Sequence, residues 1–141
     1  MPNVPESAKI EFRHRRIREL EDITDLVAMI FPGNRNQQHA AARILLFLKA
    51  AGPPVRSLGS FEARHNISRR TLERTRAKLA AVGLIEYLSP LSKRANGQPG
   101  WRLSRRMSAA LRLLGDKIEA WRDDKRPERA EKDERLVGML F

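Results

Sequence analysis

Apolar residues recur every three or four positions over long parts of this chain, which is the spacing of amphipathic helices. The first such segment covers residues 9–31, and its apolar face consists of Ile17, Leu20, Ile23, Val27 and Ile30. The Pro-Gly-Asn sequence at residues 32–34 ends it. Residues 37–51 follow as a helix that is apolar on nearly every side, with Asn36 as its expected N-cap. Such a helix belongs in the core of a domain.

Residues 57–83 show the pattern of two shorter helices joined by a turn. Asn66 predicts the position of the turn, because asparagine tolerates a left-handed backbone. Ser68 then caps a helix over residues 69–82, whose inner face is expected to contain Leu72, Thr75 or Arg76, Leu79 and Val82. Gly83 ends this helix, since only glycine avoids a Cβ clash in the left-handed position.

Two short strands are predicted at residues 84–88 and 100–104, on either side of a segment with two prolines and an Asn-Gly turn. They should form an antiparallel hairpin with a long tip. Residues 105–122 then predict an amphipathic helix with apolar positions four or three residues apart, namely Met107, Leu111, Leu114, Ile118 and Trp121. This heptad-like stripe suits a partner helix.

The amino-acid composition changes near the end of the chain. Residues 123–135 contain eleven charged residues of thirteen and predict a solvated linker or a frayed helix, and an apolar tail at residues 136–141 follows. The chain then divides into an N-terminal extension (1–35), a domain (36–105), a C-terminal helix (106–122) and this linker with its tail (123–141). The expected fold class is mainly α with a small β-hairpin, in which N- and C-terminal amphipathic helices flank the domain.

Positive charge is concentrated in one part of the chain. Residues 56–106 hold twelve Lys or Arg against three acidic residues, and therefore carry nine of the eleven net positive charges. Residues 1–35 hold six charges of each sign, and residues 107–141 hold eight of each. A field focused on one region attracts phosphate, whereas the same charge spread evenly would mainly confer solubility. We therefore expect double-stranded DNA as the partner.

The sequence Ile67–Arg74 (ISRRTLER), continuing through Leu79 to the Gly-Leu-Ile sequence at residues 83–85, resembles the recognition helix of MarR-type and GntR-type transcriptional regulators. Those families share a Ser cap, a Thr three residues later, a Leu in mid-helix and a Gly-Leu-Ile exit. Together with the order of elements, the motif resembles a winged helix-turn-helix domain over residues 36–105. Arg76 departs from the pattern, because those families place an apolar residue there. Either the helix is rotated, or Arg76 reaches a carboxylate across the groove.

The resemblance implies that outward side chains near the start of helix 69–82 read bases in the major groove. These side chains are Arg69, Arg70, Thr71, Glu73 and Arg74. We expect Arg70 and Arg74 to be the base readers, since a guanidinium can donate two hydrogen bonds to guanine O6 and N7. Thr71 could touch a thymine methyl or a phosphate, and Glu73 could accept from cytosine or hold an arginine. Lys78 lies late enough in the helix to meet only the DNA backbone. The alternative is a solvated basic face without nucleic acid.

The hairpin tip supplies a second predicted contact, a basic wing over residues 89–102 that lies along the backbone and minor groove. Its expected contact residues are Lys93, Arg94, Asn96 and Arg102. Arginine in a minor groove senses groove width and negative potential. The alternative is a tip that stays in solvent. Arg105 and Arg106 open the last helix, where the macrodipole disfavours cations, so their placement indicates an outside partner such as phosphate.

Three kinds of function remain open, and we expect the first, a sequence-specific transcriptional regulator. The second is a DNA-bound accessory factor for plasmid or phage replication or partition, whose tail 136–141 docks a partner protein. The third is a winged-helix module that binds an acidic protein. A homodimer could form through helices 9–31 and 105–122, or both helices could fold back onto the monomer core.

Enzymatic function is not expected. The histidines His14, His39 and His65 are scattered without metal-ligand spacing, and neither a Gly-rich phosphate loop nor a nucleophile elbow is present. We therefore expect no metal and no cofactor. The longest apolar run, residues 44–48, is too short for a membrane span. The absence of cysteine fits a reducing compartment, so a cytoplasmic protein is expected.

Overall fold

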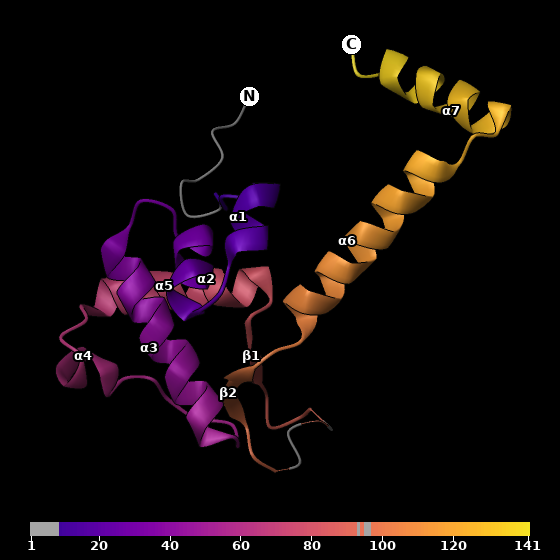
Figure 1. Cartoon of the computed structure of the whole chain (residues 1–141). Helices are drawn as coiled ribbons and strands as arrows, with labels where there is room; N and C mark the ends of the chain where they lie inside the picture. Colours follow the sequence, from indigo (N-terminus) through magenta and orange to yellow (C-terminus); the bar gives the residue numbers. More distant parts are fainter. Residues whose placement is uncertain (1–8, 93, 95–96) are drawn as a thin grey trace. The chain divides into compact units, whose positions relative to one another are not determined.

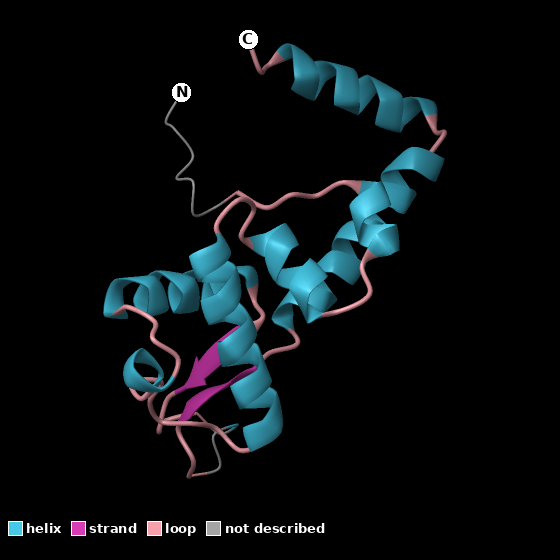
Figure 2. Ribbon diagram, turned by 60° about the vertical axis from the view of Figure 1, so that its left-hand side comes forward, coloured by secondary structure: helices cyan, strands magenta, loops and turns pink. Residues whose placement is uncertain are grey.

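The computed structural model describes residues 9–92, 94 and 97–141. Residues 1–8 of the predicted extension lie outside the described residues, as do Lys93 and Asn96 of the predicted wing. The described chain is mainly helical with one small antiparallel hairpin, which confirms the predicted fold class (Figures 1 and 2). It divides into two compact units, one ending at Arg106 and the other covering Met107–Phe141.

The segment predicted as one N-terminal helix is two short helices, and the prediction of a continuous helix was wrong. Helix α1 covers His14–Glu19 and helix α2 covers Ile23–Ile30. Asp22 separates them as the N-cap of α2, because its side chain accepts a hydrogen bond from the Asp25 amide at 3.1 Å. The Asp25 carboxylate accepts in return from the Asp22 amide at 3.4 Å. This reciprocal cap satisfies amides that a continuous helix would satisfy internally, while the apolar periodicity runs on across the break.

Helix α3, Arg35–Ala51, is the core helix that its composition predicts. Its cap is Asn34 rather than Asn36, since the Asn34 side chain accepts from the Gln37 amide at 3.0 Å. The buried side chains of α3 are Ala40, Ala41, Ile44, Leu45 and Leu48. Helix α3 packs against α2, against the helix over residues 69–82 and against the strand over residues 100–103.

The next two helices begin and end close to the predicted residues. Helix α4 covers Phe61–Arg64, and helix α5 covers Arg69–Val82. Between them Asn66 has a φ of 52°, in the left-handed region. The Ser68 side chain accepts from the Thr71 amide at 3.1 Å, and Gly83 ends α5 with a φ of 87°. Phe61, Ile67, Leu72 and Leu79 are buried, so both helices pack into the same core as α3.

The hairpin consists of strand β1, Ile85–Leu88, and strand β2, Gly100–Leu103. Their antiparallel register places Glu86 opposite Arg102 and Tyr87 opposite Trp101. Val55 adds one further antiparallel bridge to Trp101, through backbone hydrogen bonds of 2.9 and 2.7 Å. The predicted strands are thus confirmed, each one residue shorter.

The second unit contains helix α6, whose first residue belongs to the first unit, and helix α7. Helix α6 covers Arg106–Asp123 and helix α7 covers Pro127–Gly138. Of the two alternatives predicted for residues 123–135, the linker was wrong over most of the segment, and a helix is observed from Pro127 onward. Pro127 lies at the start of α7, where its preset φ favours a helix, and Arg129 pairs with Asp133 one turn later at 3.2 Å. The Trp121 indole donates to Asp133 at 3.0 Å and joins the two helices.

Candidate nucleic-acid interface

The outer face of α5 carries most of the predicted base readers. Since Leu72, Thr75 and Leu79 point into the core, the opposite side of the helix faces solvent. Its exposed residues are Arg69, Arg70, Glu73, Arg74, Ala77 and Ala81. Within the described part of the chain, Arg70 and Arg74 form no ion pair. Two exposed guanidinium groups one turn apart are thus available to an outside partner.

The other three predicted residues at the start of α5 have partners within the helix. The Arg69 guanidinium donates to the Glu73 carboxylate at 3.1 Å, so Glu73 holds an arginine, one of its two expected roles. The Ser68 hydroxyl donates to the Thr71 hydroxyl at 2.9 Å. Thr71 is half-buried and part of the helix cap. The first turn of α5 is thereby held rigid next to Arg70 and Arg74.

Lys78, expected to reach the DNA backbone from an exposed position, is instead buried. Its relative exposure is 6%, and its ammonium donates to the backbone carbonyl of Lys9 at 2.7 Å. The ammonium also lies 4.9 Å from the centre of the Phe31 ring. Burial lowers the pKa of Lys78, because desolvation disfavours the charged form. The residues before α1 cover this part of α5. The spacing of residues within one helix does not reveal such a contact with a distant segment.

The base of the hairpin contains a cluster in which three arginines surround one buried carboxylate. Glu86 on β1 accepts from Arg94 at 2.8 Å and from Arg102, its cross-strand neighbour, at 2.9 Å. Arg106 lies 3.3 Å from the same carboxylate. We call Glu86, Arg94, Arg102 and Arg106 the Glu86 cluster. Sequence reasoning counted Glu86 only as an acidic residue, although its register opposite Arg102 follows from the predicted hairpin.

The Glu86 cluster keeps two net positive charges. Burial by itself raises the pKa of Glu86, but the hydrogen bonds from Arg102 and Arg94 and their charges outweigh burial and lower it. The carboxylate therefore stays ionised at neutral pH. The side chains of Arg94 and Arg106 remain 55% and 65% exposed, and that of Arg102 is 32% exposed. The outward sides of the first two can still meet an anion. Arg105, the remaining predicted contact, is exposed beside them.

Arg76 forms no ion pair with a carboxylate among the described residues, so the second of its two expected arrangements is not observed. Its guanidinium lies 5.1 Å from the centre of the Trp101 ring on β2, a cation–π contact. Tyr87 packs edge-on against the same ring, with centroids 5.2 Å apart. The three side chains hold α5 against the hairpin. The basic face of α5 and the Glu86 cluster are consequently carried by one packed unit.

The second unit exposes an apolar surface. Of the predicted stripe on α6, only Met107 is buried, and the side chains of Leu111, Leu114, Ile118 and Trp121 are exposed. The end of α7 and the three residues after it add exposed side chains, namely Leu136, Val137, Met139, Leu140 and Phe141. Such a concentration of uncovered apolar side chains is characteristic of an interaction surface.

In the described part of the chain, no helix combines the length and the hydropathy that crossing a membrane requires. No family model, curated protein or solved structure matches this chain.

Proposed function

We propose that this chain is a sequence-specific transcriptional regulator that binds double-stranded DNA in the cytoplasm through a winged helix-turn-helix domain, residues 36–105. In this proposal α5 lies in the major groove, and the wing over residues 89–102 lies along the backbone and minor groove. The observation that carries it is the pair Arg70 and Arg74, exposed and free of ion pairs among the described residues, on a helix packed against a second basic element.

The geometry supports base reading by α5 in two ways. Each guanidinium can donate two hydrogen bonds to a guanine edge, a contact worth about 1–3 kcal/mol of discrimination. The contact between Arg76 and Trp101 fixes α5 relative to the hairpin, so the two basic elements do not need to be ordered separately on binding. The Glu86 cluster, with two net positive charges, supplies attraction that does not depend on base sequence.

Selection from a random duplex library at physiological salt tests the proposal. A recovered motif would support a regulator, and an inverted repeat with half-sites about one helical turn apart would support a dimeric one. Duplex binding without enrichment would favour an accessory factor for plasmid or phage replication or partition. If the purified protein binds no duplex, DNA binding is refuted, and a module for an acidic protein becomes the better proposal.

Two alanine variants should separate base reading from phosphate contact. Arg70→Ala is expected to relax the preference at one base pair and to cost about 1–3 kcal/mol on the selected site. Arg94→Ala should instead weaken all sequences alike and reduce the salt slope of log K by about 1. Titrations of both variants against matched and mismatched duplexes over a salt series measure these effects. Equal losses with unchanged base preference would show that α5 does not read the sequence.

We further propose that two copies of the chain associate through α6 and α7. Within the first unit α2 buries Val27, Met29 and Ile30 and so packs on the monomer core, whereas α1 buries none of its residues. Residues 107–141 carry eight charges of each sign, and two copies would not repel one another there. The apolar tail, residues 136–141, belongs either to this interface or to that of a partner protein.

Leu114→Glu should disrupt this dimer, because it places a carboxylate in the middle of the exposed apolar stripe of α6. Analytical ultracentrifugation should show a dimer for the wild type and a monomer for the variant. Leu113→Glu is the matched control, since Leu113 is exposed on the same helix but lies outside the stripe. A wild-type monomer at micromolar concentration would contradict the proposal, as would equal dimerisation of both variants.

A further inference from the structure

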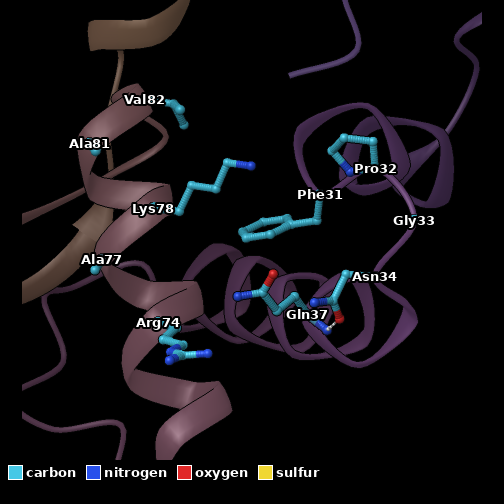
Figure 3. Close-up of a pocket in the computed structure, with 10 residues that line it drawn as sticks. All are labelled: Phe31, Pro32, Gly33, Asn34, Gln37, Arg74, Ala77, Lys78, Ala81 and Val82. Carbon is cyan, nitrogen blue, oxygen red and sulfur yellow. Dashed lines mark hydrogen bonds between the residues drawn. The ribbon is translucent and has the colours of Figure 1, made fainter. Parts of the chain in front are cut away.

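A hollow of about 980 Å³ lies between α5 and the segment that joins α2 to α3 (Figure 3). Residues 31–34 and Gln37 form one wall, and Arg74, Ala77, Lys78, Ala81 and Val82 of α5 form the other. Two of these ten residues are cations and none is acidic. The hollow adjoins the exposed face of α5. Arg74, Ala77 and Ala81 belong to that face and also line the hollow.

Lys78 gives the hollow its chemical character. Its side chain extends from α5 toward the Phe31 ring (Figure 3). The ammonium has three hydrogens to donate, and the hydrogen bond to the Lys9 carbonyl uses one of them. Within the described residues it has no carboxylate partner. A buried cation without a counter-ion is costly, and an anion in the hollow would supply the missing charge and an acceptor.

The remaining walls allow an anion to reach this ammonium. Arg74 lies one turn before Lys78 on α5 and adds a second, exposed guanidinium. Ala77 and Ala81 are the smallest side chains on the outer face of α5, so they leave the approach open. The amides of Asn34 and Gln37 line the opposite side and supply neutral donors.

We propose that this hollow binds a phosphate group, with Lys78 and Arg74 as its cationic contacts. Two cations without an acidic neighbour match a phosphate group, which carries up to two negative charges near neutral pH. The phosphate comes from one of two sources. It belongs either to the DNA backbone, in which case the site rests on the proposed function, or to a small phosphorylated ligand. A small ligand would compete with DNA for Arg74.

Thermal unfolding of the full chain tests the site itself, with inorganic phosphate as the probe and chloride at equal ionic strength as the reference. Because phosphate stabilises folded proteins in general, it should raise every melting temperature, but it should raise that of the wild type more than those of Lys78→Met and Ala81→Glu. Ala81→Glu places a carboxylate at an exposed helical position beside the hollow, where it can occupy the anion's place without disturbing the core. Lys78→Met also loses the hydrogen bond to Lys9, and this loss could prevent folding. Ala81→Glu keeps that hydrogen bond, so it tests the site even if Lys78→Met does not fold.

Lys49→Met is the matched control, because it removes the same charge from an exposed position on α3 that does not line the hollow. It should respond to phosphate as the wild type does. Equal stabilisation of all four proteins would overturn the site, since phosphate would then bind elsewhere on the basic surface. No stabilisation of the wild type would overturn it as well.

Duplex titrations over a salt series distinguish the two sources of phosphate. If the DNA backbone occupies the hollow, Lys78→Met should reduce the salt slope by about 1 relative to Lys49→Met. If the occupant is a small ligand, the two slopes should agree while phosphate still stabilises the wild type. A wild type that binds no duplex but retains Lys78-dependent stabilisation by phosphate would refute the proposed function and leave the site standing.

Discussion

Replacing Glu86 with alanine is expected to lower the free energy of unfolding by about 2–3 kcal/mol. The variant removes the common partner of Arg94, Arg102 and Arg106, and leaves three cations close together at the base of the hairpin. Removing one partner of a buried ion pair costs more than the pair contributes, because the remaining charge stays partly desolvated. The cost is moderated here because all three guanidinium groups retain some contact with solvent.

Urea unfolding of the full chain at neutral pH measures this loss. Glu62→Ala is the matched control, since Glu62 is exposed on α4 and forms no ion pair among the described residues. It should change stability by less than about 0.5 kcal/mol. If the two variants lose the same stability, the Glu86 cluster does not stabilise the fold.

The same comparison has a defined dependence on pH. The pKa of Glu86 is lowered from its ordinary value of 4.5, so the folded state holds the carboxylate ionised more strongly than the unfolded state does. The resulting stabilisation is fully present above the unfolded pKa and is lost as the pH falls through the folded pKa. The difference in stability between the wild type and Glu86→Ala should therefore shrink below pH 4.5. A constant difference down to strongly acidic pH would contradict the assigned ion pairs.

Replacing Gly100 with alanine should destabilise the protein by about 3 kcal/mol or more, because the side chain has no room and the backbone conformation is unfavourable. A Cβ atom at this position would lie 2.5 Å from the carbonyl oxygen of Val55 and 2.6 Å from its carbon. The φ of Gly100 is +144°, which other residues rarely adopt. The two backbone hydrogen bonds between Val55 and Trp101 hold the segments together, so relief of the clash would break them.

Gly115→Ala in α6 is the matched control for this substitution. A Cβ atom there meets nothing within 4 Å, and alanine is the better helix former. The control should be neutral or more stable than the wild type by about 0.5–1 kcal/mol. Chemical denaturation of both variants measures the contrast. A Gly100→Ala protein as stable as the wild type would show that Val55 and β2 are not held as close as described.

The features that the sequence predicts well depend on contacts between neighbouring residues. Asn66, Ser68 and Gly83 define the bounds of α5, because a left-handed turn, a side-chain cap and a glycine terminator act within about three residues. The exposed positions of Arg70 and Arg74 follow from the same helix and its buried leucines. The sequence alone therefore predicts α5 and the exposure of its two arginines.

Two local sequence signals indicate helix bounds that periodicity and average composition do not. Asp22 and Asp25 have the spacing of a capping box, which starts a new helix after Asp22 although the apolar periodicity of residues 9–31 continues across it. Pro127 and the Arg129–Asp133 spacing favour a helix in a segment whose high charge left a linker and a frayed helix as alternatives. In both segments a capping or pairing signal outweighed the average composition of the surrounding residues.

The sequence by itself determined the helices, the hairpin and the concentration of positive charge, since these follow from periodicity, capping and composition within short segments. Only the tertiary structure decided which groups surround each charged side chain. Lys78 donates to a carbonyl sixty-nine residues away, and Glu86 pairs with Arg106, which lies outside the register of the hairpin. Such partners are chosen by how helices and strands pack, and packing depends on the shape of the whole core rather than on spacing along the chain.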